Sequence, residues 1–294
     1  MQTVAPWVPE FSTWMRFGFR YCNPRKTFAG WDFSGASNTS ELNALLNKHA
    51  MLRRIKADVL KDLPPKVYRT LPLEFDRREY DKVEAAFNGV NWQAGMEAIV
   101  RMRGNVAKSN DAIVAIQKLR EIAAYAKLES AVEWIKDYTD EGEKLVVFAH
   151  NRHVIDTIKS ELEKDPDYQG AVGAIYGGVS DEARADAVLD FQNDPKVRII
   201  IIGITAGGFG LTLTSAKAVA FIQLPWTPGE IGQCVDRIHR IGQEADSVTI
   251  YNLVAEGTIE EDMADMLIGK GQVLDAVLDN GRVVNTVDIK IAGK

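Results

Sequence analysis

Three polar residues in the segment "QCVDRIHRIGQ", residues 233–243, are spaced so that a helix would present them together to a ligand: Gln233, Arg237 and Arg240. In a helix, at 100° per residue, these three fall within about 60° of one another. Apolar residues take roughly the opposite side of that helix, namely Ile231, Cys234, Val235, Ile238 and Ile241. The pattern predicts one face packed against the protein and an opposite polar face accessible to a ligand. The alternative is that the arginines form surface ion pairs, for example with Asp236.

The predicted helix has well-defined ends. Thr227 can cap its N-terminus, Pro228 suits the first turn, and Glu230 can complete a capping box. Gly242 suits a left-handed residue at the C-terminal end. We therefore expect one helix from Pro228 to just before Gly242.

Bulk composition limits the possible functions. The chain has 294 residues, of which 46% are hydrophobic and 26% charged, and its net charge of −6 gives no overall basic field for nucleic acid. Any nucleic-acid contact must therefore depend on a local patch. Two distant cysteines, Cys22 and Cys234, exclude a disulfide framework and a cysteine zinc site. With no long apolar run, we expect a soluble intracellular protein, cytoplasmic or, in a eukaryote, nuclear.

Short β-branched runs alternate with helical patterns from about Lys144 onward. This alternation predicts an open α/β domain with a parallel sheet, roughly residues 105–258. The predicted strands are "KLVVFA", "AVGAIY", "VRIIIIG", "AVAFIQ" and "SVTIYNLV". Ligands bind such sheets at the carboxyl ends of the strands.

The flanking regions predict mainly helices. Before residue 67 we expect a helix capped by Asn38 and Glu41, and a basic helix over residues 51–62 that stops at two prolines. That basic helix could be a phosphate-facing patch or a solvated face. Residues 76–140 are predicted to be mostly helical, and residues 259–281 form a closing helix interrupted near Gly269 and Gly271.

The segment "IIIIGITAGGFGLTLTSAKAVAFIQLPWTPGEIGQCVDRIHRIGQEADSVTIYNLVAEGTIEED" resembles motifs V and VI of the SWI/SNF-type ATPases of helicase superfamily 2. Upstream, "KLVVFAHNRHVIDTI" is similar to motif IV, and the wording "RYC…GWDFSGASN" is most similar to the annealing-helicase (HARP-like) branch. The form "ITAGG" departs from most relatives, which carry an arginine before the glycines. The contact made by that arginine is therefore in doubt here.

The resemblance implies a RecA-like open parallel sheet and the C-terminal half of an ATP-dependent DNA translocase. It implies that Arg237 and Arg240 reach the ATP γ-phosphate and that Gln233 orients the same region. Gly207, Gly208 and Gly210 would approach the nucleotide through their backbone. On spacing alone, these glycines could instead form a structural turn.

The resemblance also implies double-stranded or branched DNA as partner, bound through its phosphates. The candidate residues each follow a predicted strand: His150, Asn151, Tyr176, Gly177, Thr205 and Trp226. Trp226 could instead be a packed loop anchor. No metal site is predicted, since His150 and His153 have no third ligand nearby in sequence.

The phosphate-binding loop "GxxxxGK[ST]" that such motors need is absent from the sequence. Asp181 and Glu182 mimic a metal-holding "DEAH" box but open a helix, so they are read as N-terminal helix charges. We therefore expect ATP and Mg²⁺ to be bound mainly by a first helicase lobe, without which this chain is inactive as an ATPase.

The implied domain plan has three parts. Residues 1–75 would be the tail of the first lobe or a linker, residues 76–258 the second RecA-like lobe with its leading helices, and residues 259–294 a bracing helix and tail. Two alternatives stay open: a freestanding, non-catalytic DNA-binding or regulatory module derived from such a motor, and a nucleotide-binding enzyme of unrelated chemistry on a similar sheet.

Overall fold

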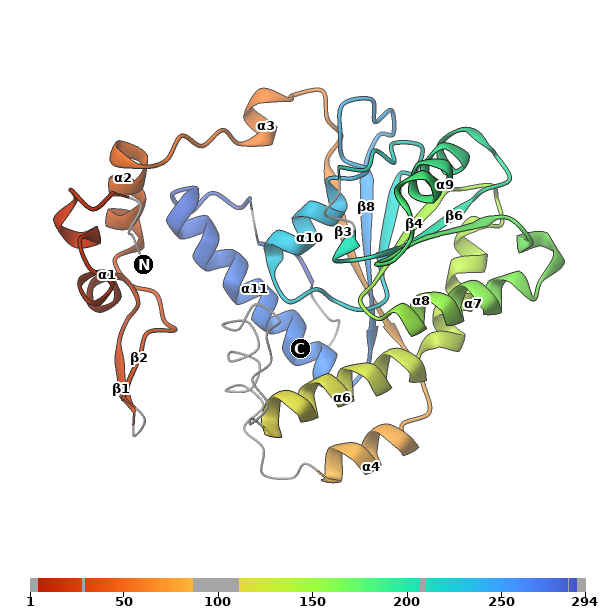
Figure 1. Cartoon of the computed structure of the whole chain (residues 1–294), viewed down its shortest axis with the longest axis horizontal. Coiled ribbons are helices and arrows are strands. Elements are labelled where there is room, and N and C mark those ends of the chain that lie inside the picture. The colour runs from red at the N-terminus through yellow and green to blue at the C-terminus, as the bar shows by residue number, and fades with distance from the viewer. Residues whose placement is uncertain (1–4, 28–29, 87–110, 207–209, 285, 290–294) are drawn as a thin grey trace. The chain divides into compact units, whose positions relative to one another are not determined.

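The computed structural model describes residues 5–27, 30–86, 111–206, 210–284 and 286–289, with backbone only at 111–113 (Figure 1). The chain forms two compact units. One comprises Met1–Lys61 and Ile268–Thr286, and the other comprises Asp62–Leu267 and Val287–Lys294. The second unit contains the large sheet and every described candidate residue. The three-part domain plan of the sequence stays a prediction.

The large unit is built on a six-stranded, wholly parallel sheet in the order β3-β8-β7-β4-β6-β5. The strands are β3 Lys66–Leu73, β4 Leu145–Ala149, β5 Val172–Ile175, β6 Ile199–Gly203, β7 Ala218–Phe221 and β8 Val248–Ala255. Every residue of β4, β6 and β7 is buried, as expected for parallel strands covered on both faces. The predicted open α/β fold is confirmed.

Helices cover both faces of this sheet. They are α4 Arg78–Ala86, α6 Asp111–Ala126, α7 Leu128–Thr139, α8 Arg152–Glu163, α9 Asp181–Asn193, α10 Pro228–Val235 and the first part of α11 Ile259–Leu278, with a short 3-10 turn, η2 Pro166–Tyr168. The apolar faces of α7 and α8 share one core cluster with alternate residues of β4 and β6. Among the described residues, no helix is both long and apolar enough to cross a membrane.

A buried ion pair joins the α6–α7 junction to the start of α11. Lys127 Nζ lies 2.5 Å from Glu260 Oε2 and 2.5 Å from the carbonyl oxygen of Leu253, and both charged side chains are almost wholly buried. Glu260 also accepts the backbone N–H of Ala255. Since both charges are paired and hydrogen-bonded, this contact fixes α6, whose preceding turns carry residues of the candidate site.

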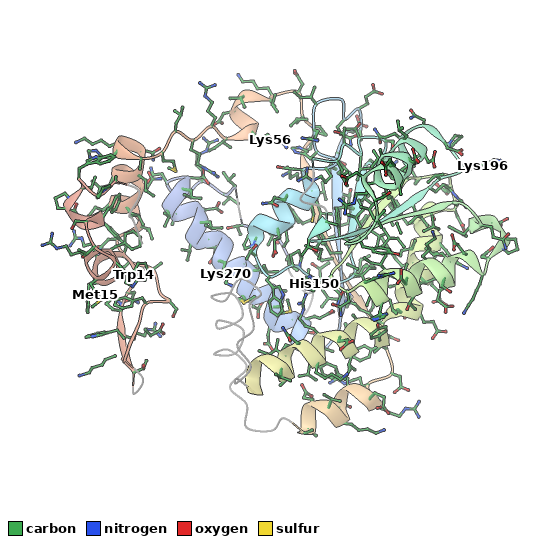
Figure 2. The ribbon with its side chains drawn as sticks, viewed as in Figure 1. Trp14, Met15, Lys56, His150, Lys196 and Lys270 are labelled. Atoms are coloured by element: carbon green, nitrogen blue, oxygen red, sulfur yellow. The ribbon has the colours of Figure 1, made fainter. Side chains whose placement is uncertain are left out.

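The smaller unit joins segments that lie far apart in the sequence. Its elements are η1 Pro9–Phe11, α1 Trp14–Tyr21, β1 Arg25–Thr27, β2 Gly30–Asp32, α2 Thr39–His49, α3 Lys56–Val59 and the second part of α11. Arg53 pairs with Asp279 at 2.6 Å, and Arg282 pairs with Asp58 at 2.9 Å. Figure 2 labels Trp14, which is 48% exposed on α1.

Two predicted helices of the flanking regions differ in the structure. The prediction of a basic helix over residues 51–62 is wrong, because only Lys56–Val59 of this segment, helix α3, are helical. The adjacent Arg53 side chain is turned toward Asp279 instead. The closing helix is continuous through Gly269 and Gly271, so the predicted interruption is wrong as well. A glycine within a helix costs only about 1 kcal/mol relative to alanine, which long helices tolerate.

The predicted cap of α2 is also wrong in its chemistry, although the helix does begin after Asn38. The Asn38 side chain makes no capping bond and instead donates to the carbonyl oxygen of Arg20. Glu41 accepts from Arg20 and from the Tyr21 hydroxyl. Both residues of the expected capping pair thus hold α2 against α1.

Candidate nucleic-acid and nucleotide site

The parallel strands bring their carboxyl ends to one edge of the sheet. His150 and Asn151 follow β4 directly, Tyr176 follows β5, and Thr205 lies two residues after β6. The N–H of Ile204 donates to the carbonyl oxygen of Ala149 at 3.0 Å, which joins the exits of β6 and β4. Figure 2 labels His150 at this edge and Lys196, which precedes β6 and so belongs to the amino edge.

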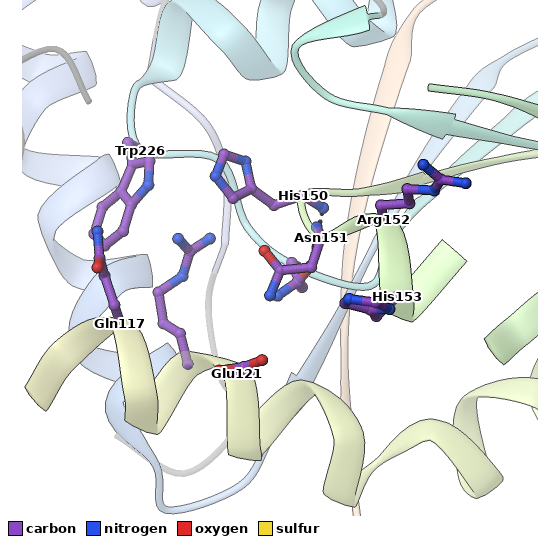
Figure 3. Close-up of a pocket in the computed structure, with 9 residues that line it drawn as sticks. Gln117, Glu121, His150, Asn151, Arg152, His153 and Trp226 are labelled. Atoms are coloured by element: carbon purple, nitrogen blue, oxygen red, sulfur yellow. Dashed lines mark hydrogen bonds between the residues drawn. The ribbon is translucent and has the colours of Figure 1, made fainter. Parts of the chain in front are cut away.

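A pocket of about 500 Å³ opens at this edge (Figure 3). It brings together three of the predicted DNA-binding residues, His150, Asn151 and Trp226. The full lining is Gln117, Arg120, Glu121, His150, Asn151, Arg152, His153, Gln223 and Trp226. Most of these side chains are polar, so the pocket suits a polar or charged ligand.

Gln223 fixes the loop after β4. Its Oε1 accepts the backbone N–H of His150 at 2.9 Å and that of Asn151 at 3.0 Å, and its side chain is buried. Sequence reasoning missed this residue. A signal existed, since a polar residue ends the otherwise apolar run "AVAFIQ".

Arg120 reaches the pocket from α6 and was also missed. Its residue is only 6% exposed, its Nη2 donates to the carbonyl oxygen of Leu224 at 2.6 Å, and its Cζ lies 4.1 Å from the centre of the Trp226 ring. Burial lowers the pKa of Arg120 to about 10, and the charges of Glu260 and Glu230 oppose that shift. The guanidinium is therefore still positively charged at pH 7.

Trp226 is held on two sides. Its ring lies against Arg120, and its backbone N–H donates to Glu230 Oε2 at 3.0 Å. The same carboxylate accepts the N–H of Thr227, whose hydroxyl oxygen in turn accepts the N–H of Glu230. The predicted capping box of α10 is thus confirmed. Through it, the start of α10 fixes the position of Trp226.

His150 lies in an environment that disfavours its charged form. Burial lowers the pKa of His150, the nearby Arg120 charge lowers it further, and Glu230 opposes the shift. The imidazole is therefore neutral at pH 7 and carries one N–H donor and one acceptor. A neutral imidazole can donate a hydrogen bond to a phosphate oxygen, but it cannot form an ion pair with the phosphate.

The remaining DNA candidates, Tyr176, Gly177 and Thr205, do not line this pocket. The Tyr176 ring lies beneath Arg152, whose Cζ is 4.8 Å from the ring centre. An added Cβ at Gly177 would meet no atom within 4 Å, so its backbone is open to approach. Thr205 is exposed. Gly207 and Gly208 lie outside the described residues.

The arginine segment differs from its prediction. The α-helix ends at Val235, and residues 236–242 continue as tight turns that end at Gly242 with φ +95°. Ile241 is 77% exposed, so its predicted place on the packed face is wrong. The other apolar residues of that face, including Ile231 and Ile238, are buried. The C-terminal half of the segment is therefore not a helical face.

Arg237 and Arg240 differ in their bonding. Arg237 is 9% exposed, and in the described part of the chain its Nε has no hydrogen-bond partner. Arg240 Nη1 donates to the carbonyl oxygens of Gly210 at 3.2 Å and Leu211 at 3.0 Å, and to the Thr212 hydroxyl at 2.9 Å. Arg240 thus holds residues 210–212, which include the predicted nucleotide-binding Gly210.

The neighbouring polar residues complete this segment. Asp236, which the surface-pair alternative assigned to an arginine, lies 3.4 Å from Lys66 Nζ. Gln233 is exposed on α10, where it is accessible to a ligand. Gln233 is therefore accessible, Arg237 is buried with its Nε unbonded in the described chain, and Arg240 is bonded within the chain.

Comparison with known proteins agrees with this fold. Residues 126–242 match the helicase conserved C-terminal domain. The chain is 37% identical over 96% of its length to the mouse protein "DNA annealing helicase and endonuclease ZRANB3", and it covers 26% of that protein. It is also 37% identical over 88% of its length to "SWI/SNF-related matrix-associated actin-dependent regulator of chromatin subfamily A-like protein 1" of Xenopus tropicalis, again covering 26%.

Among solved structures, the chain is similar to the "Sulfolobus solfataricus SWI2/SNF2 ATPase core in complex with dsDNA". The alignment covers 95% of this chain and 61% of the solved chain, with a TM-score of 0.54 and 22% sequence identity. That likeness shows the fold alone. The fold and the matched domain define a RecA-like helicase C-terminal lobe. The chain belongs to the SWI/SNF-type helicases of superfamily 2, and its relatives include annealing helicases. It spans about a quarter of the length of the two curated relatives named above.

Proposed function

We propose that the chain acts as the second motor lobe of an ATP-dependent DNA translocase of the annealing-helicase type, on double-stranded or branched DNA. The observation that carries this proposal is the pocket at the carboxyl edge, where His150, Asn151 and Trp226 converge. Ligands of open parallel sheets bind at this edge. The relatives named above, one of them a DNA annealing helicase, support the same reading.

DNA is proposed to lie along this edge through its phosphates. The loop after β4 offers the neutral His150 ring and the Asn151 amide, while Tyr176, Gly177 and Thr205 border the same edge. The overall charge of −6 gives no attraction, so the local cations Arg120 and Arg152 must supply it. Such contacts position the protein without reading base sequence.

ATP is proposed to bind mainly to a first lobe, with this chain closing the site. Arg237 fits that role, because its buried guanidinium retains hydrogen-bond donors that the described chain does not use. Mg²⁺-ATP would supply the phosphoryl group, and Arg237 would stabilise charge on it. Gln233 and the glycines at 207, 208 and 210 would lie beside the nucleotide. Arg240 would contribute by holding the loop at Gly210.

The segment roles follow the same plan. Residues 1–75 are proposed to continue from the first lobe, and residues 259–294 to brace the motor. The contacts of Arg53 with Asp279 and of Asp58 with Arg282 support a brace, since they join the start of the chain to the end of α11.

The test is reconstitution. The chain is mixed with a first lobe that carries a "GxxxxGK[ST]" loop, and phosphate release is measured with and without duplex DNA. We expect DNA-stimulated release only from the mixture. Arg237→Ala should lower that rate by about 10³- to 10⁵-fold, the range known for arginine fingers. The control variant is Arg198→Ala, at the amino edge of the sheet, which should fold and keep the DNA-stimulated rate of phosphate release.

Two outcomes would contradict the proposal. ATP hydrolysis by the chain alone that depends on Arg237 would show that no first lobe is needed. Duplex binding with no stimulated hydrolysis by any first lobe would instead favour the freestanding DNA-binding module.

A further inference from the structure

Arg120 is a buried cation whose hydrogen bonds are incomplete. Its guanidinium has five N–H donors, and in the described part of the chain the only acceptor bonded to them is the Leu224 carbonyl oxygen. No carboxylate pairs with it there. A buried charge without a paired counter-charge is costly. A charged group of this kind that lines a pocket is a candidate for ligand binding.

The carboxylates around Arg120 are already bonded elsewhere. Glu260 accepts from Lys127 and from the N–H of Ala255. Glu230 accepts the backbone N–H groups at the start of α10. Glu121, which lines the pocket, lies 3.7 Å from Lys118. The positive charge of Arg120 is therefore not neutralised by direct contact.

The Trp226 ring holds the guanidinium in a fixed plane. With Cζ 4.1 Å from the ring centre and Nη2 bonded to Leu224, Arg120 has little freedom to rotate. Its remaining donors belong to a side chain that lines the 500 Å³ pocket. A planar guanidinium fixed in this way is matched to the oxygens of a phosphate group.

We propose that Arg120 binds a backbone phosphate in this pocket, which His150 and Asn151 also line. The proposal rests on the DNA-binding function above and adds a specific anchor to it. The pocket volume is far larger than one phosphate, so it admits a phosphodiester together with its sugars. A DNA strand that enters the pocket would thus be held by one buried charge rather than by surface lysines.

The experiment measures duplex binding by the full chain at several salt concentrations. Each phosphate contact adds about 0.9 to the slope of log K against log[salt]. We expect Arg120→Gln to lower that slope by about this amount and to weaken binding. The matched control is Arg198→Gln. Arg198 also stacks on an aromatic ring, with Cζ 4.5 Å from the Tyr168 centre, and donates to two carbonyl oxygens.

An unchanged slope in folded Arg120→Gln would overturn the anchor while leaving the DNA function intact. If that variant does not fold, the proposal is tested by NMR of the wild-type chain with added inorganic phosphate. Inorganic phosphate should then shift the His150 ring and Trp226 indole signals and leave those of His49 and His239 in place. No shift overturns the anchor. A chain that shows these shifts but binds no duplex keeps the anion site and refutes the DNA function.

Discussion

The two edges of the sheet each carry an arginine stacked on an aromatic ring. At the amino edge, Arg198 lies over Tyr168 and donates to the carbonyl oxygens of Thr139 and Asp167. At the carboxyl edge, Arg120 lies over Trp226 and donates to one carbonyl oxygen. The stacking is alike, whereas the bonding is not. Incomplete bonding, more than burial, therefore distinguishes the edge that we propose binds a ligand.

The same contrast separates two arginines only three residues apart. Arg240 shares one Nη among three acceptors of the loop 210–212, while the buried Nε of Arg237 has no partner in the described chain. An arginine that completes its bonds inside the protein mainly contributes to stability. One that does not is better suited to a ligand.

The largest expected effect compares two buried cations near the α6–α7 junction. Lys127→Met leaves Glu260 buried without its counter-charge and should lower the free energy of unfolding by about 3–5 kcal/mol. Arg120→Met breaks no ion pair and should cost at most about 2 kcal/mol. Urea unfolding of both variants measures the difference.

A double variant sharpens this comparison. Lys127→Met combined with Glu260→Gln removes both charges and keeps the bond to the Ala255 N–H, so it should recover part of the loss. If Lys127→Met and Arg120→Met lowered the free energy of unfolding equally, the distinction between a buried cation with a paired carboxylate and one without would be contradicted.

A smaller effect is expected within the arginine segment. Arg240→Ala removes the bonds to Gly210, Leu211 and Thr212 and should lower the free energy of unfolding by about 1–2 kcal/mol. Arg237→Ala should cost less, because its Nε has no bond to lose. The reverse order in thermal unfolding would assign Arg237 a structural role and Arg240 the available one.

The smallest effect is a pH dependence at the carboxyl edge. Because burial and Arg120 lower the pKa of His150 in the folded state, the unfolded chain takes up a proton first as pH falls below about 6.5. Unfolding is thereby favoured in acid, and above that pH the effect vanishes. His150→Gln should lose less stability than wild type between about pH 7 and pH 5. An identical loss in both proteins would mean that the His150 pKa is not lowered.

The sequence was sufficient for five of the six strands of the sheet, all except β3, and for part of the site. Buried β-branched runs predicted the strands β4 to β8, and the polar residues after them predicted His150, Asn151 and Trp226 at one edge. These inferences succeed because parallel strands must be apolar on both faces and must end together. The capping box at Thr227 was equally local, since its two residues are three apart.

The missed features depend on tertiary contacts. Arg120 looks like a surface residue of α6, and only the packing of α6 against the loop after β7 buries it. The end of α10 at Val235 was missed because an apolar period persists through Ile238, although the backbone has already left the helix. Helical periodicity therefore predicted which apolar residues of this segment are buried, with the exception of Ile241. It did not predict the different hydrogen bonding of Arg237 and Arg240.

Hydrogen–deuterium exchange with and without duplex DNA tests the central claim most directly. The account predicts slower exchange in residues 148–153 and 222–226, at the carboxyl edge, and no change in residues 139–144 and 166–171, at the amino edge. Slower exchange confined to the amino edge, or to the unit that contains residues 5–61, would contradict it.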